Sequence, residues 1–321
     1  MKNEQLTYTS EFASEVQEGL TSFPKFLSSK FIYDEKGDVL FQKIMDLPEY
    51  YLTNCEYSIL EKHTDAIADQ FNSENGFDLI ELGAGDGKKT KILLRHLVAK
   101  KYDFNYLPID ISGHILEKLE AALKEEMPDL KVNIQQGMYF KVLGKLAEYN
   151  TRKKIIIVLG SNIGNLNHEE AIDFLKNIQL AMSKDDMLFM GFDQKKDPQI
   201  ILDAYNDKTG VTAAFNKNIL HRINQELGAN FKPDNFKHWE TYNPETGTAK
   251  SFLVSLEEQK VTIPELKLEV NFKKWESIHT EISQKYDDEV VEWLADKAGL
   301  KVKEFFSDDK KFYKNYVFQK K

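Results

Sequence analysis

The sequence predicts an α/β protein that is built on a parallel sheet and carries a second, α+β lobe inserted before the sheet is complete. Two observations indicate this. Between residues 56 and 197, apolar runs of strand length alternate with segments of helical periodicity, the pattern of parallel strands joined by right-handed helical crossovers. Residues 198–284 do not follow this alternation, and the residues from 285 onward return to it.

The elements of the first block follow from the spacing of apolar residues. Leu60, Ile67 and Phe71 are at helical spacing before a first strand at 78–82. A helix with Ile92, Leu93, Leu97 and Val98 comes next, then a strand near 106–110 and a helix over 115–127. Further strands are expected at 131–134, 154–159 and 187–193, with a helix from Asn167 or His168 before the last. The run at 154–159 is β-branched and typical of a strand buried on both faces.

The rest of the chain completes the sheet around an insert. Residues 289–298 predict a helix that Gly299 ends, and 302–306 with 313–318 predict an antiparallel hairpin. The insert contains helical patterns at 200–205 and 213–227 and strand patterns at 250–256 and 260–270. We therefore expect four parts: an N-terminal segment, 1–55, that packs with the insert; a core, 56–197; the insert, 198–284; and a C-terminal completion of the core, 285–321.

The most informative segment is Asp78-Leu-Ile-Glu-Leu-Gly-Ala-Gly-Asp-Gly-Lys-Lys-Thr90. A buried strand ends on the acid Glu81 and runs into three alternating glycines before a helix. Glycines let the backbone approach a ligand because they lack a Cβ, and the helix N-terminus offers free N–H groups. Together they indicate a Rossmann-like, nucleotide-type cradle at the carboxyl end of the first strand. A tight strand-to-helix turn without a ligand is the alternative.

The glycine spacing separates three cofactor classes. A P-loop requires G-x-x-x-x-G-K-[ST], and this turn is one residue short, so its lysine would miss the phosphates. A dinucleotide fingerprint requires G-x-G-x-x-G, and Gly87 comes one place early. The remaining pattern, E-L-G-x-G-x-G, resembles motif I of class I S-adenosylmethionine (AdoMet) methyltransferases, whose acid suits the ammonium and sulfonium of AdoMet.

Asp110 ends the second expected strand. A carboxylate at that position, about 25 residues after the glycine turn, can take both hydroxyls of a ribose. The alternative role for Asp110 is a helix N-cap, which Ser112 could fill instead.

Composition bounds the partners. The 321 residues are 41% apolar and 30% charged, as in an ordinary globular protein. The net charge of −9 disfavours nucleic acid, since phosphate binding needs a basic face, and no apolar run approaches a membrane span. The single cysteine, Cys55, fits a reducing cytoplasm, and the seven histidines show no metal-ligand spacing. We expect a cytoplasmic, monomeric enzyme that acts on a small molecule and binds no metal, nucleic acid or membrane.

Four further segments make a family match specific. They are residues 31–41 (FIYDEKGDVLF), 47–53 (LPEYYLT), 159–166 (LGSNIGNL) and 204–216 (AYNDKTGVTAAFN). With the glycine turn, they resemble the histidine-specific Nα-methyltransferases of ergothioneine biosynthesis, in the same order from about residue 12 to the C-terminus. The resemblance implies the seven-stranded class I methyltransferase sheet, AdoMet as cofactor, and L-histidine as a substrate whose α-amine is methylated to trimethylhistidine (hercynine).

The resemblance also assigns acceptor residues. The contacts to the amino-acid carboxylate match Asn165 and Tyr205, which can both donate hydrogen bonds. The imidazole contacts match Tyr50, Glu281 and Ser283, of which Glu281 would accept an imidazole N–H. Tyr33 matches a tyrosine near the amine, where it would orient the amine or pass its proton to water.

For the cofactor, the resemblance implies Gly83, Lys89 and Asp110, and the close backbone approach at the glycine turn adds Gly85. Two positions depart from the family. Met138 stands where the family has an acid that accepts the adenine amino group, so we expect backbone groups and packing on Met138 or Tyr139 to hold adenine. Ser251 stands where the family often has a methionine in the pocket wall, and its smaller, polar side chain would widen the site.

These departures leave two other interpretations open. One is a methyltransferase of the same fold that acts on another amino acid or amine, such as a tryptophan-like substrate. The other is a non-catalytic protein of the same fold that binds a metabolite or a partner chain.

Overall fold

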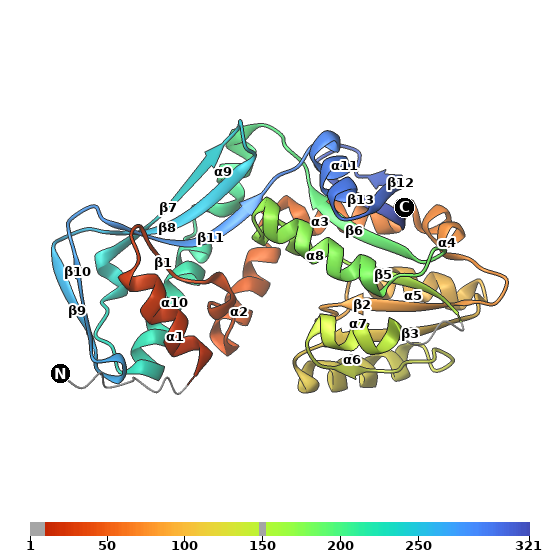
Figure 1. Cartoon of the computed structure of the whole chain (residues 1–321), viewed down its shortest axis with the longest axis horizontal. Coiled ribbons are helices and arrows are strands. Elements are labelled where there is room, and N and C mark those ends of the chain that lie inside the picture. The colour runs from red at the N-terminus through yellow and green to blue at the C-terminus, as the bar shows by residue number, and fades with distance from the viewer. Residues whose placement is uncertain (1–9, 148–151) are drawn as a thin grey trace. The chain divides into compact units, whose positions relative to one another are not determined.

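A computed structural model describes residues 10–147 and 152–321 (Figure 1). The chain divides into two compact units. One, here called the insert unit, comprises residues 1–51 and 196–283; the other, the core unit, comprises residues 52–195 and 284–321.

A seven-stranded sheet organises the core unit. Its strand order is β12-β13-β6-β5-β2-β3-β4. The strands are β2 (Phe77–Leu82), β3 (Phe104–Asp110), β4 (Gln135–Gln136), β5 (Lys153–Val158), β6 (Met187–Asp193), β12 (Leu300–Ser307) and β13 (Tyr313–Lys320). Strands β6 to β4 of this order are parallel, whereas β13 is antiparallel to both of its neighbours. Because β3 and β5 lie on opposite sides of β2, the carboxyl end of β2 is a topological switch point, where α/β sheets bind ligands.

Helices cover both faces of this sheet. On one face, α7 (Tyr139–Ala147), α8 (His168–Ala181) and α11 (Asp288–Lys297) share an apolar core with Ile80 and Leu82 of β2. Phe77, Leu79 and Glu81 of β2 alternate with these residues and are buried on the other face of the sheet. The remaining helices of the unit are α3 (Tyr51–Lys62), α4 (Thr64–Phe71), α5 (Thr90–Ala99) and α6 (Gly113–Glu126). The ring of Phe71 in α4 packs edge-on against Phe77, the first residue of β2.

The chain leaves the core unit after β6 and returns before α11. At this place the outgoing and returning segments pair with each other: the Lys195 amide donates to the Tyr286 carbonyl (2.7 Å), and the Tyr286 amide donates to the Asp193 carbonyl (2.9 Å). A fully buried ion pair of 2.8 Å between Asp193 and Lys285 lies beside them. The two ends of the intervening segment are therefore fixed side by side within the core unit.

The insert unit has its own four-stranded sheet, in the order β1-β11-β8-β7, and a separate hairpin of β9 and β10. Its strands are β1 (Lys25–Phe26), β7 (Phe236–Asn243), β8 (Thr248–Ser255), β9 (Gln259–Ile263), β10 (Leu268–Phe272) and β11 (Ser277–Gln284). Its helices are α1 (Glu11–Thr21), α2 (Glu35–Met45), α9 (Pro198–Tyr205) and α10 (Val211–Leu227). The N-terminal segment is anchored on α10, because the Asn218 amide donates to the Ile32 carbonyl (3.1 Å).

The structure confirms the α/β class and the seven-stranded sheet, and it corrects two local predictions and adds two strands. The strand expected at 131–134 is displaced to 135–136, and Val132 forms only an isolated bridge to Tyr106. The expected strand 260–270 is two strands, separated by a turn that begins at Pro264. Strands β7 and β11 were not predicted. Among the described residues, no helix is both long and apolar enough to cross a membrane.

Candidate functional site

The glycine turn after β2 has the backbone that its sequence predicts. Gly83 and Gly85 both have positive φ, +75° and +52°, a region that side chains with a Cβ rarely adopt. A Cβ at Gly83 would lie 2.8 Å from the Tyr139 hydroxyl, whereas a Cβ at Gly85 would meet nothing within 4 Å. The turn thus leaves free space directly over Gly85.

The Asp110 carboxylate lies at this turn. Its Oδ2 accepts a long hydrogen bond from the Gly85 amide (3.5 Å), and its Oδ1 accepts from the Ser112 amide (3.0 Å). Ser112 caps α6 by accepting from the Ile115 amide. The N-cap role that was the alternative for Asp110 is therefore filled by Ser112.

Met138 and Tyr139 follow the carboxyl end of β4, where α7 begins. Burial, together with the charges of Asp110 and Glu81, raises the pKa of Tyr139 to about 12. Its hydroxyl therefore stays protonated at neutral pH and can donate a hydrogen bond. Met138, the residue before Tyr139, is 61% exposed, which leaves its apolar side chain open to a ligand.

Glu81, the acid before the glycines, turns away from the turn into the core. Its carboxylate accepts hydrogen bonds from Thr90 (2.5 Å) and from Tyr106. Burial raises the pKa of Glu81 to about 7, against the smaller opposing effect of these two hydroxyls. The motif's acid fixes the start of α5 on β2, which differs from the cofactor contact that the sequence suggested.

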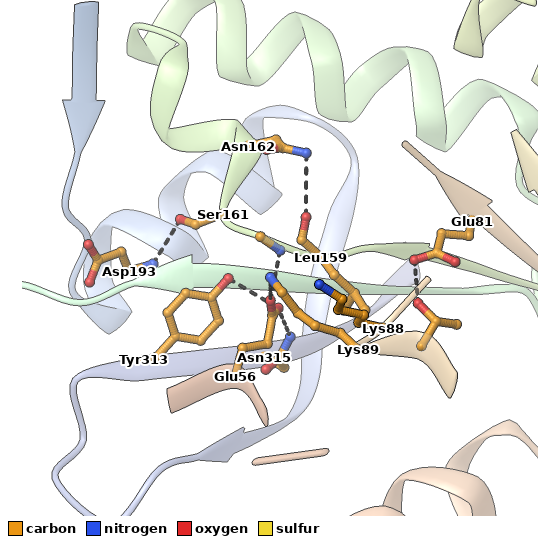
Figure 2. A network of polar contacts seen from close by, with 12 residues as sticks. Glu56, Glu81, Lys88, Lys89, Leu159, Ser161, Asn162, Asp193, Tyr313 and Asn315 are labelled. Carbon is orange, nitrogen blue, oxygen red and sulfur yellow. Dashed lines mark hydrogen bonds and ion pairs between the residues drawn. The ribbon is translucent and has the colours of Figure 1, made fainter. Parts of the chain in front are cut away.

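Lys89, at the start of α5, forms an ion pair with Glu56 of α3 (2.7 Å; Figure 2). The Glu56 carboxylate is fully buried, and the Lys89 side chain is 20% exposed. Sequence reasoning missed Glu56. The signal was present, because Glu56 shares one helical face with the apolar residues Leu52, Ile59 and Leu60, where a charged side chain needs a partner.

Asn165 lies in the turn after β5, in the short helix η2 (Asn162–Asn165). Gly160 and Ser161 lead into it with positive φ, +87° and +57°. A hydrogen bond fixes this turn on the segment that precedes α11, since the Tyr286 hydroxyl donates to the Ile163 carbonyl (3.1 Å). The Asn165 side chain itself is exposed.

The other five acceptor candidates all belong to the insert unit, and the structure brings them together. The hydroxyls of Tyr205 and Ser283 share a hydrogen bond of 2.8 Å, and the rings of Tyr50 and Tyr205 meet edge-on, 6.1 Å apart. Burial raises the pKa of Tyr33 well above its ordinary value, and the charges of Glu281, Tyr50 and Tyr205 act in the same direction. Glu281 thus lies within electrostatic range of the tyrosines with which the sequence grouped it.

Two aromatic residues in this cluster were not predicted. Phe41 of α2 and Phe215 of α10 both pack against Tyr33, with ring centroids 5.5 Å and 5.2 Å away. Phe41 also meets Tyr50 at 6.3 Å. Both residues lie inside the segments that carried the resemblance, but a phenylalanine in a helix is most often an ordinary core residue.

Ser251 is buried, and its hydroxyl donates to Glu240 of the neighbouring strand (2.7 Å). Its backbone carbonyl accepts from the Thr280 hydroxyl (3.2 Å). The serine that departs from the family pattern is therefore half of a buried polar pair within the insert sheet.

Comparison with known proteins agrees with the resemblance. A family profile for histidine-specific, SAM-dependent methyltransferases matches residues 12–320. The chain is 35% identical to a histidine N-alpha-methyltransferase from Mycolicibacterium smegmatis, over 92% of this chain and 90% of that one. It is 30% identical to ergothioneine biosynthesis protein 1 from Schizosaccharomyces pombe, over 92% of this chain and 39% of that longer protein.

Among solved structures, a S-adenosylmethionine-dependent methyltransferase from Clostridium acetobutylicum aligns with a TM-score of 0.41 and 13% identity, covering 80% of this chain and 89% of that one. The family match and the identity over nearly the whole length decide the assignment. This chain belongs to the family of histidine-specific methyltransferases that depend on S-adenosylmethionine.

Proposed function

We propose that this protein is an AdoMet-dependent Nα-methyltransferase that converts L-histidine to Nα-trimethylhistidine (hercynine). Family membership supports the reaction type and the cofactor. The observation that carries the acceptor is the position of Glu281. It shares one face of β11 with Ser283, whose hydroxyl is hydrogen-bonded to Tyr205, and its charge acts on Tyr33. An apolar box would suit a hydrocarbon side chain, whereas a carboxylate suits a ring that offers N–H groups.

The glycine turn fits the cofactor. The free space over Gly85 admits a ligand against the backbone, and the Asp110 carboxylate at the same turn can accept both ribose hydroxyls. Tyr139 keeps its proton and can donate, and the exposed Met138 offers an apolar surface for adenine. Bound AdoMet supplies a methyl group on a sulfonium, which leaves as a neutral thioether and needs no general acid.

The acceptor residues hold the amino acid at two places. Glu281 and Ser283 receive the imidazole, with Tyr50 at its edge, and Tyr205 donates to the carboxylate, as proposed also for Asn165. Tyr205 and Ser283 already share a hydrogen bond, so their hydroxyls are oriented before substrate binds. Catalysis then consists mostly of positioning the amine, an effect that can contribute ~7–11 kcal/mol.

Tyr33 orients the amine and does not deprotonate it as a phenolate, because its raised pKa keeps the hydroxyl neutral at physiological pH. Its neighbours Phe41 and Phe215 supply further aromatic faces. Such faces attract a methylammonium by cation–π interaction, which favours the single positive charge that the nitrogen acquires in each transfer.

The test is to incubate the protein with AdoMet and each proteinogenic amino acid and to analyse the products by mass spectrometry. L-Histidine should gain up to three methyl groups, and fragmentation should place all three on the α-nitrogen. Nα-Acetylhistidine, whose α-amine is blocked, is the matched control and should remain unmodified.

Methylation of Nα-acetylhistidine would show that the enzyme modifies the imidazole ring and not the α-amine. Methylation of a different amino acid in preference to histidine would retain the cofactor assignment and replace the acceptor. A protein that binds AdoMet but modifies no amine would contradict the proposed function.

A further inference from the structure

The core unit contains a buried carboxylate that the reaction outlined above does not use. Glu56 of α3 is fully buried, and its two oxygens accept four hydrogen bonds (Figure 2). Oε1 accepts from the Tyr313 hydroxyl (3.1 Å) and the Asn315 amide (2.9 Å) of β13. Oε2 accepts from the Lys89 ammonium (2.7 Å) and the Gly160 amide (2.8 Å).

The surroundings make room for this carboxylate. A Cβ on Gly191 of β6 would lie 2.5 Å from Glu56 Oε1 and 2.2 Å from the Tyr313 hydroxyl. Any residue other than glycine there would displace Glu56 or Tyr313. With two donors on each oxygen, Glu56 has little capacity left for a ligand, so its effect must pass through the groups that it holds.

Two of those groups belong to the cofactor cradle. Lys89 follows the glycine turn of β2, and Gly160 begins the turn after β5. The Lys89 ammonium lies 3.5 Å from where a Cβ on Gly160 would be. In the described part of the chain, the ammonium has Glu56 as its one hydrogen-bond partner, which leaves N–H groups for a ligand. Glu56 therefore ties two separate edges of the cradle to one point.

The chemistry of AdoMet decides what Lys89 can bind. Its methionyl carboxylate is the one anionic group of the cofactor, and a lysine ammonium is a point charge that binds anions. The position agrees with this. Asp110, which suits ribose, lies on the β3 side of β2, whereas the Lys89 ammonium lies on the β5 side. The methionyl end of the cofactor would then extend from the ribose toward β5.

We propose that Glu56 is a positioning residue that holds the Lys89 ammonium and the Gly160 turn where they receive the amino-acid end of AdoMet. The inference rests on the proposed function only in taking AdoMet as the cofactor. The proposal predicts a selective effect. Replacing Glu56 should weaken the binding of adenosyl ligands that carry the amino-acid end and leave the binding of adenosyl thioethers without it unchanged.

The experiment is calorimetric titration of the full-length protein with two ligands, S-adenosylhomocysteine and 5′-methylthioadenosine, which lacks the amino-acid end. Glu56→Gln and Lys89→Met should each weaken S-adenosylhomocysteine about 10- to 100-fold, the range for a hydrogen bond to a charged group. Both should leave the affinity for 5′-methylthioadenosine unchanged. The double variant should lose less affinity than the sum of the two single losses, because part of the effect of Glu56 passes through Lys89.

Lys88→Met is the matched control. Lys88 is the adjacent lysine, its side chain is 64% exposed, and it pairs with Asp86; its removal should change neither affinity. If Glu56→Gln does not fold, as judged by its thermal melt, Glu56→Asp keeps the charge but withdraws the carboxylate from Lys89. It should show the same selective loss in weaker form.

Equal losses for both ligands would mean that Glu56 only maintains the fold and would overturn the proposal. Unchanged S-adenosylhomocysteine affinity in Glu56→Gln, or additive losses in the double variant, would overturn it as well. A wild-type protein that binds neither ligand would instead contradict the proposed function, so the two failures are distinguishable.

Discussion

At the residue scale, Glu281 has the clearest expected effect. Glu281→Ala should raise the KM for histidine and lower kcat/KM about 10- to 100-fold, because a hydrogen bond to a charged group contributes ~1.5–3 kcal/mol. Relative activity toward apolar aromatic amino acids should rise, and the affinity for S-adenosylhomocysteine should not change. Steady-state kinetics with both classes of acceptor measure this.

Glu269→Ala serves as the control for Glu281→Ala. Glu269 is an exposed acid of the same unit, paired with Lys260 across the β9–β10 hairpin (2.7 Å), and its removal should leave the kinetics unchanged. Wild-type rates with histidine in Glu281→Ala would remove Glu281 from the acceptor site.

Gly85 offers a cleaner probe of the cofactor turn than Gly83. At Gly83 a side chain would meet Tyr139, so a bulky substitution there strains the fold as well as the site. Gly85→Asn places a residue that tolerates left-handed backbone into open space. We expect an unchanged melting temperature and a loss of at least about tenfold in S-adenosylhomocysteine affinity, or ~1.4 kcal/mol. Wild-type affinity would move the ligand away from this turn.

Met138 tests how adenine is held. Met138→Asp supplies the acid that the family has at this position. If the position faces the adenine amino group, the affinity for 5′-methylthioadenosine should increase, because a charged acceptor strengthens the hydrogen bond. Calorimetry measures it. A weaker affinity would show that Met138 packs on the ring and that the exposed methionine is itself the adenine contact.

The residue assignments show what a sequence can and cannot yield. Glycines and an acid at the end of a strand predict a ligand-binding turn from sequence alone, because the positive φ angles that require glycine depend only on neighbouring residues. Glu56 is different, since its partners come from α5, β13 and the turn after β5, and only the folded sheet brings them together. Glu81 shows the converse: its place in the motif suggested a ligand contact, but strand alternation turns it inward to Thr90 and Tyr106.

At the scale of elements, α8 depends on its first turn. The Asn167 side chain accepts from the Glu170 amide (3.0 Å), and the Glu170 carboxylate accepts from the Asn167 amide (2.8 Å), a complete capping box. Asn167→Ala should therefore reduce the free energy of unfolding by ~1 kcal/mol. Urea denaturation measures this, with Asn177→Ala in the exposed middle of the same helix as a control that should cost nothing. Equal effects of the two would deny the cap.

Elements were predictable where burial follows a single physical rule. Strands β5 and β6 are buried along almost their whole length and mostly apolar, because helices cover both faces of the sheet. Strands β7 and β11 could not be predicted from apolar periodicity, because the insert sheet buries polar residues. Examples are the hydrogen-bonded pairs Glu240–Ser251 and Thr280–Asn216. The two members of each pair come from different elements, so their hydrogen bonds form only after the sheet and α10 have come together. The β9–β10 hairpin looks like one strand in the sequence because both halves share a strand pattern, but Pro264 interrupts it, and proline is rare inside strands.

At the scale of the whole molecule, Glu81 makes stability depend on pH. Its folded pKa of about 7 lies above the ordinary glutamate pKa of 4.5, so between these two pH values the folded state holds a proton that the unfolded state has lost. Stability is therefore fully present below about pH 4.5 and falls as the pH rises through 7. A shift of this size corresponds to at most about 3 kcal/mol.

Glu81→Gln should abolish that contribution. Relative to wild type, the free energy of unfolding of Glu81→Gln should increase, which means a more stable protein, by up to ~3 kcal/mol as the pH is raised from 5 to 8. Denaturant titrations at several pH values measure the difference. Glu117→Gln, at an exposed position of α6, should run parallel to wild type. Parallel curves for Glu81→Gln as well would mean that Glu81 is ionised throughout.

The pairing of Asp193 and Lys195 with Tyr286 has a consequence for how such a chain can change over time. Because the core unit itself fixes the departing and returning strands side by side, it is largely indifferent to the length of what lies between them. Closing a loop twice as long costs only ≈ 0.6 kcal/mol more. During evolution, the segment between these paired ends, which we propose recognises the acceptor, could therefore be replaced by another while the cofactor-binding residues of the core unit stay unchanged.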